Sequence, residues 1–132
     1  MKMYKRPLIL FMLLSLAGCA VGAGFIAGTA MGIVGYKYYE GKLIVIYQAP
    51  FMDTWDATLR TLKRIKIKIK SSRHGLTSGN IKAVGLNNEP INISFKYISS
   101  QETQVSIRVG LLGDKKASST IKEEIRKELF ER

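Results

Sequence analysis

Side chains that could do chemistry are few in this sequence. The 132 residues include one cysteine, Cys19, and one histidine, His74. His74 precedes a glycine in a predicted turn, where we expect a surface side chain. A histidine with neither a second histidine nor a free cysteine to share a metal does not form a zinc site. The sequence therefore predicts no metal centre.

Paired acids and sequence motifs give no sign of catalysis either. Asp53 and Asp56 lie three residues apart early in a predicted helix, where carboxylates complement the positive end of the helix dipole. The sequence shows neither a Ser-His-Asp motif nor a phosphate loop, and the glycines of residues 22–35 do not follow a predicted strand, as a dinucleotide fingerprint requires. We expect no enzyme and no cofactor.

The first residues have the pattern of an export signal. Residues 2–6 carry three basic side chains, and residues 8–16 read LILFMLLSL, which is too short to span a bilayer alone. The four residues that follow this pattern resemble the lipobox of bacterial lipoproteins, namely Leu16, Ala17, Gly18 and Cys19. The resemblance implies signal peptidase recognition at residues 16–18, removal of residues 1–18, and lipidation of Cys19.

Lipidation at Cys19 predicts a location in the cell envelope. In bacterial lipoproteins the cysteine sulfur receives a diacylglyceryl group and the amine a further acyl chain such as palmitate, and two or more chains anchor a protein stably. Ala20 follows the cysteine. In enteric bacteria an Asp at this position resembles the signal that retains a lipoprotein at the inner membrane. We therefore expect this protein to lie in the outer membrane and to face the periplasm. The alternative is an uncleaved signal anchor with a chance cysteine. We expect no nucleic-acid partner in that compartment.

Residues 20–35 form an uncharged segment, AVGAGFIAGTAMGIVG. Gly24, Gly28 and Gly32 recur every four residues, so on a helix they line one face, as in packed membrane helices. As a helix the segment would reach about 24 Å, less than the ~30 Å hydrocarbon core. Three interpretations stay open: a helix that enters the membrane leaflet beside the lipid and associates with other copies through its glycines, a flexible tether, and the second half of a longer transmembrane span.

The remaining residues, 37–132, are predicted to fold as one soluble domain. Removing residues 1–18 takes away three of the 21 basic residues and none of the ten acidic ones, which leaves a net charge of +8. The only cysteine is the lipidated one, so no disulfide can form within the chain. Folding must rest on an apolar core, which 96 residues can provide.

Hydrophobic periodicity gives the elements of this domain. Alternating or β-branched runs predict strands at residues 42–47, 65–70, 76–85, 91–97 and 101–109. A stripe that includes Trp55, a predicted core anchor, indicates a helix from Pro50 to near Arg64. A closing helix carries Ala117, Ile121, Ile125 and Leu129 after a cap at Asp114 or Ser118.

The element order, β-α-β-β-β-β-α, predicts an α+β fold. The crossover helix makes the first two strands parallel, and three hairpin reversals bring the fifth strand antiparallel beside the first. One sheet in the order 2-3-4-5-1 follows, with both helices on one face, after an N-terminal apolar helical segment. This arrangement resembles the TATA-binding-protein-like or helix-grip folds. Proteins that share a fold need not share a function, so this resemblance assigns none.

Basic residues should gather on the face of the sheet that the helices leave open. The run IKIKIK places Lys66, Lys68 and Lys70 opposite three isoleucines. The predicted strands add three further cations to that face, Lys82, Lys96 and Arg108. They could bind an anion, such as a phospholipid headgroup, a lipopolysaccharide phosphate or an acidic envelope protein, or they could be solvated charges that block strand aggregation.

Short motifs along nearly the whole chain resemble one family. They are the lipobox, the glycine-rich run, Tyr39-Glu40-Gly41-Lys42-Leu43, Ala49-Pro50 with Trp55, and Val105-Ser106-Ile107-Arg108-Val109-Gly110 before Gly113-Asp114. The chain is similar to a family of small bacterial lipoproteins known only as a domain of unknown function, number 3568. The resemblance implies a cellular location and a fold, and it assigns no catalytic residues.

Two functions follow as expectations. The first is a membrane-anchored lipoprotein of the cell envelope that acts without catalysis as a binding or assembly module. The second is a structural envelope protein that forms homo-oligomers through its glycine-rich segment.

Overall fold

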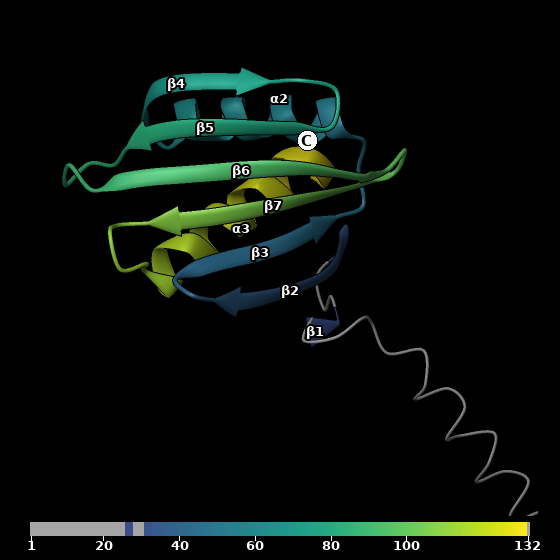
Figure 1. The fold of residues 1–132 in the computed structure, drawn as a ribbon, viewed down its shortest axis with the longest axis horizontal. Coiled ribbons are helices and arrows are strands. Elements are labelled where there is room, and N and C mark those ends of the chain that lie inside the picture. The colour runs from purple at the N-terminus through teal and green to yellow at the C-terminus, as the bar shows by residue number, and fades with distance from the viewer. Residues whose placement is uncertain (1–25, 28–30, 132) are drawn as a thin grey trace, which may run out of the picture.

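The computed structural model describes residues 26–27 and 31–131. Within these residues, seven antiparallel strands form one sheet and two helices lie behind it in Figure 1. The strands are β1 (Ile26–Ala27), β2 (Ile33–Tyr39), β3 (Lys42–Tyr47), β4 (Lys68–His74), β5 (Ser78–Val84), β6 (Pro90–Ser99) and β7 (Glu102–Val109). The helices are α2 (Phe51–Arg64) and α3 (Lys115–Phe130). The predicted α+β class is confirmed.

The strand order is β1-β2-β3-β7-β6-β5-β4. The five predicted strands correspond to β3, β4, β5, β6 and β7, and their predicted neighbours are confirmed. Two strands that the periodicity did not predict, β1 and β2, extend the sheet beyond β3. Chain reversals at 40–41, 85–89 and 110–114 lie at one end of the strands, whereas β2 begins at the other end (Figure 1).

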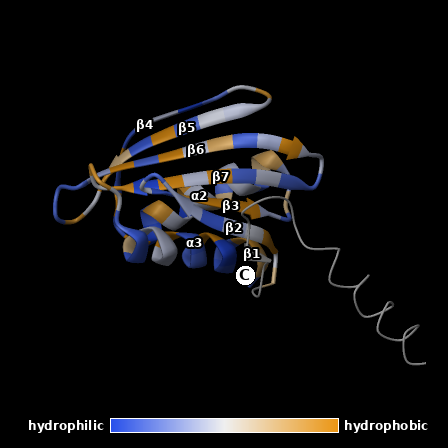
Figure 2. Cartoon of the chain, turned by 60° about the horizontal axis from the view of Figure 1, so that its bottom comes forward, coloured by the Kyte–Doolittle hydropathy of each residue, from blue (hydrophilic) through white to orange (hydrophobic). Residues whose placement is uncertain are grey.

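The core lies between the sheet and the helices. Along β7, Thr103, Val105, Ile107 and Val109 are buried and alternate with half-buried residues, and Figure 2 shows the same alternation of hydrophobic and polar residues along the strands. Trp55 on α2 is only 4% exposed. The prediction that it anchors the core is therefore confirmed.

Contacts of the closing helix also follow the sequence pattern. Ile121 and Ile125 are buried in the core, and Ala117 and Leu129 pack against it. The helix begins after Asp114, whose carboxylate accepts a hydrogen bond from the backbone N–H of Ala117 at 3.0 Å. Of the two predicted caps, Asp114 is the one that the structure uses.

Part of the glycine-rich segment is strand. Ile33 begins β2, and Ile26–Ala27 pairs with Tyr36 and Gly35. Gly32 has φ +88° in a turn, where a Cβ would overlap the ring of Phe130. A helix that includes Gly32 is thus wrong for the described residues, because this turn redirects the chain into the sheet. Gly24 and Gly28 lie outside them. In residues 31–131, neither helix is long and apolar enough to cross a membrane.

The end of α2 differs from the predicted strand at residues 65–70. The backbone N–H of Ile67 donates to the carbonyl of Leu62, and that of Lys66 donates to Lys63. Together with φ +64° at Lys66, these bonds form the Schellman motif that ends many helices. The motif occupies residues 65–67, so β4 begins at Lys68 and Lys66 does not stand on the sheet.

Candidate functional site

The sheet face away from the helices is rich in basic residues. Because side chains alternate along a strand, the neighbours of buried residues point to this open face. Lys82 on β5 is paired with Asn92 on β6, which is paired with Arg108 on β7. The open face therefore carries Lys82 and Arg108 on strands separated by one other strand.

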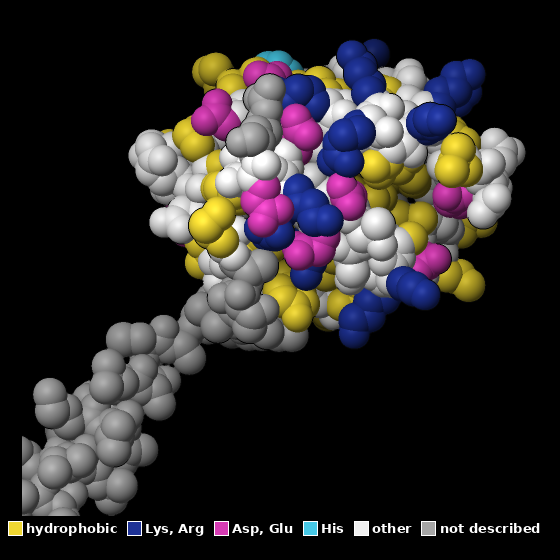
Figure 3. All heavy atoms as spheres, turned by 180° about the vertical axis from the view of Figure 1, so that it is seen from behind, with side chains coloured by type: hydrophobic (Ala, Val, Ile, Leu, Met, Phe, Trp, Pro, Cys, Tyr) yellow, Lys and Arg dark blue, Asp and Glu magenta, His cyan; other side chains and the backbone are white. Residues whose placement is uncertain are grey.

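Acidic residues are concentrated elsewhere. Seven of the ten lie on the helices or at their ends, namely Asp53, Asp56, Asp114, Glu123, Glu124, Glu128 and Glu131. Acidic and basic side chains intermingle on this helix layer in Figure 3. Its arginines are paired: Arg60 with Glu128 at 2.9 Å, and Arg64 with Glu124 at 2.9 Å. The helix layer thus neutralises much of its charge, unlike the open face.

The structure brings together half of the six predicted cations. Lys70, Lys82 and Arg108 line one hollow. Lys68, paired with Val84, and Lys96, paired with Gln104, share the open face but do not line the hollow. Lys66 was wrongly placed there, because the Schellman motif turns it away from the sheet. Lys70 reaches the hollow at a β-bulge between Ile69 and Ser71, which re-aims its side chain.

The hollow has a volume of about 440 Å³ and lies at the end of the sheet where β5 ends and β6 begins. Its wall is largely apolar and includes Ala83, Val84, Pro90, Ile91, Gly110 and Leu111. Ligand pockets of proteins combine such apolar walls with a few placed polar groups, over roughly 300–1,000 Å³. This hollow combines an apolar wall with cations from three strands.

Arg108 is fixed at the edge of the hollow. Its guanidinium donates to the backbone carbonyls of Glu40 and Leu111, and so joins the β2–β3 turn to the loop before α3. Its Nε is buried and has no hydrogen-bond partner among the described residues. Buried donors are normally satisfied, so this nitrogen is an exception. Arg108 also has no ion pair among the described residues, so its positive charge is not neutralised beside the hollow.

Exposed leucines surround the same end of the sheet. Leu86 in the β5–β6 turn is 79% exposed, and Leu111 and Leu112 in the loop before α3 are 82% and 93% exposed. Sequence reasoning missed these leucines and the apolar wall. The available signals were Pro90 at the start of a strand and the pair Leu111-Leu112 between two glycines.

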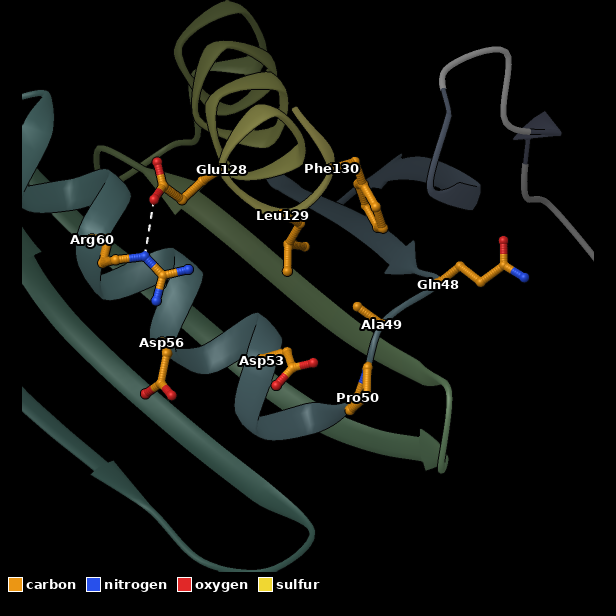
Figure 4. Close-up of a pocket in the computed structure, with 9 residues that line it drawn as sticks. All are labelled: Gln48, Ala49, Pro50, Asp53, Asp56, Arg60, Glu128, Leu129 and Phe130. Atoms are coloured by element: carbon orange, nitrogen blue, oxygen red, sulfur yellow. Dashed lines mark hydrogen bonds and ion pairs between the residues drawn. The ribbon is translucent and has the colours of Figure 1, made fainter. Parts of the chain in front are cut away.

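A second hollow, of about 360 Å³, lies between α2 and α3 (Figure 4). Asp53, Asp56 and the Arg60–Glu128 ion pair line it together with Leu129 and Phe130. The carboxylates of Asp53 and Asp56 point in different directions in this view. The two aspartates therefore do not form a convergent acid pair.

His74 is an exposed residue at the end of β4, as predicted for the surface. Its ring centroid lies 4.9 Å from that of Trp55, so it covers the indole. Within the described part of the chain, no group of three His, Cys, Asp or Glu side chains could hold a metal ion. The lipidation residue Cys19 and the recognition residues Leu16, Ala17 and Gly18 lie outside the described residues.

Comparison with known protein families gives one result. The profile of a family described as a protein of unknown function (DUF3568) matches residues 2–128. The chain belongs to this family. Since the match covers almost the whole sequence, the open face and the hollow both lie within the family's matched region. Comparison with curated proteins found no match.

Proposed function

We propose that this chain is a lipid-anchored protein of the bacterial cell envelope, and that its domain is a binding module for anionic groups such as the phosphates of envelope lipids. One observation carries the binding proposal: unpaired cations stand on the open face, whereas the acids lie mainly on the helix layer. Lys68, Lys70, Lys82 and Lys96 have no ion pair among the described residues.

The proposed anchor would leave the open face accessible. The described residues begin with β1, whose Ile26 is paired with Tyr36 on β2. Ile26 lies seven residues after Cys19, a reach of at most about 25 Å at ~3.3–3.6 Å per residue. A tether of that length would let an anchored copy present its open face to a second membrane.

The test uses the full lipidated chain in phosphatidylcholine vesicles and measures capture of separate nanodiscs that contain phosphatidylglycerol. We expect capture that weakens with added salt, because surface charges are screened. The double substitution Lys82→Gln with Lys96→Gln should weaken capture about thirtyfold, at ~1 kcal/mol per basic residue.

A matched variant controls for net charge. Lys63→Gln with Lys116→Gln removes two exposed lysines from the helix layer and should leave capture within about twofold of the parent. Equal losses in the two double variants would show that only net charge matters and would overturn the open face as the binding surface. Capture by phosphatidylcholine nanodiscs at the same level would overturn the preference for anions.

A further inference from the structure

We infer that the hollow between β4, β5, β6 and β7 binds one alkyl chain that carries a terminal anion, such as a fatty acid or an alkyl phosphate. This inference rests on the proposed function and adds the class of ligand and the place where it sits. The open face alone would bind any polyanion, whereas the hollow has an apolar wall that only an amphiphile would use.

The first argument is the pairing of an apolar wall with a cationic edge. Val84, Pro90 and Leu111 form part of the wall, and Lys82 and Arg108 stand beside it on the open face. A purely ionic ligand would leave that wall in water, and a purely apolar one would desolvate the cations without a partner. A chain with an anionic end satisfies both parts at once.

The second argument is the state of Arg108. Two of its nitrogens already bind backbone carbonyls, which fixes the guanidinium plane. Its positive charge has no ion-pair partner among residues 26–27 and 31–131. Carboxylate and phosphate oxygens are the preferred acceptors of a guanidinium, so this edge of the hollow suits the head of the ligand.

The third argument is the exposure of leucines next to the wall. Leu111 lines the hollow although it is 82% exposed, and Leu86 follows the wall residue Val84 by two positions and is 79% exposed. An alkyl chain in the hollow would cover apolar surface that is otherwise hydrated, at ~25 cal/mol per Å². The leucines thus supply contact area for the alkyl chain of the ligand outside the hollow.

The test is photo-crosslinking of the full lipidated chain in phosphatidylcholine nanodiscs. The probes are hexadecanoic acid, hexadecyl phosphate and hexadecanol, each with a diazirine in its alkyl chain. The labelled peptides are identified by mass spectrometry. We expect both anionic probes to label residues 84–91 and 108–112. Hexadecanol, which lacks the charge, should label them about fivefold less. Labelling of α3 (Lys115–Phe130) serves as the reference for non-specific reaction.

Two exposed leucines give a matched pair of variants. Leu111→Gln should lower labelling of residues 84–91 about tenfold, whereas Leu76→Gln should leave it unchanged. Leu76 is 93% exposed in the turn at the far end of β5, so neither substitution disturbs the core. Equal labelling by hexadecanol, labelling no stronger than in α3, or indifference to Leu111→Gln would each overturn the inference.

The capture assay separates the two proposals. Capture of phosphatidylglycerol nanodiscs without labelling of the hollow would overturn the amphiphile site and leave the anionic binding face in place. Loss of both signals would overturn both. A difference between hexadecanoic acid and hexadecyl phosphate would assign the head as carboxylate or phosphate within the same class of ligand.

Discussion

The hydroxyl of Tyr47 donates a hydrogen bond of 2.8 Å to the backbone carbonyl of Lys122, 75 residues further along the chain. Tyr47 is fully buried on β3, so this bond ties the middle of the sheet to α3. Burial raises the pKa of Tyr47 well above its ordinary value of 10.0; the negative charge of Glu123 adds to this effect, and Arg126 opposes it.

We expect Tyr47→Phe to lower the free energy of unfolding at neutral pH by about 1 kcal/mol, as for other lost hydrogen bonds. Above pH 10 the unfolded parent ionises Tyr47 while the folded parent does not. The free energy of unfolding is therefore unaffected by Tyr47 ionisation below pH 10. As the pH rises from 10 toward the pKa of Tyr47 in the folded state, the free energy of unfolding falls by about 1.4 kcal/mol per pH unit. Urea unfolding at several pH values measures this slope, which the variant should lack; equal slopes would contradict the assignment to Tyr47.

Trp55→Ala should lower the free energy of unfolding by about 3–5 kcal/mol, the range for large aromatic truncations in a core. The indole stacks edge-on against Phe95, with ring centroids 4.9 Å apart. Met52→Ala on the same helix is the control, since Met52 is 44% exposed and exposed substitutions stay within about 0.5 kcal/mol. Chemical denaturation followed by circular dichroism compares the two; similar midpoints would argue against Trp55 as the core anchor.

Lys66→Gly should raise the free energy of unfolding by about 0.5 kcal/mol. A side chain at φ +64° costs about 1–2 kcal/mol, which glycine would remove. The larger conformational entropy of glycine in the unfolded chain offsets about 0.4–1 kcal/mol of this gain. Lys66→Ala removes the same charge but keeps the Cβ, so it should not stabilise the protein. Thermal unfolding distinguishes the two variants, and equal shifts in Tm would attribute the effect to charge.

Cys19→Ala should abolish lipidation and leave a larger, unprocessed precursor, because the chain has no other cysteine. Intact-mass spectrometry of the membrane fraction measures both changes. A mature N-terminus at any residue other than an acylated Cys19 in the parent protein would remove the basis for the lipid anchor.

Periodicity predicted the strands β3 and β5–β7 and both helices because each has a continuous buried face. It missed β2 because the glycine spacing across residues 24–32 suggested a helix, whereas Gly32 lies in a turn that packs against the ring of Phe130, far away in the sequence. The end of the helix near Arg64 was predicted and is confirmed. The alternation IKIKIK begins at Ile65, so it could not show that residues 65–67 form a turn and that β4 begins only at Lys68.

The hollow was beyond sequence reasoning for a similar reason. Its cations were predicted from strand alternation, but the bulge that brings Lys70 to it depends on how β4 pairs with β5. Arg108 was predicted as one charge among six. Its contacts with Glu40 and Leu111 join loops that are far apart in sequence, and only the fold brings them together.

The short strand β1 also has a mechanical consequence for any tether ahead of it. Tension applied upstream of Ile26 first loads two residue pairs, Ile26↔Tyr36 and Ala27↔Gly35. The next ladder, β2–β3, has six pairs, from Ile33↔Tyr47 to Tyr39↔Lys42. A pulled domain should therefore release β1 before it disturbs β2 and the rest of the sheet.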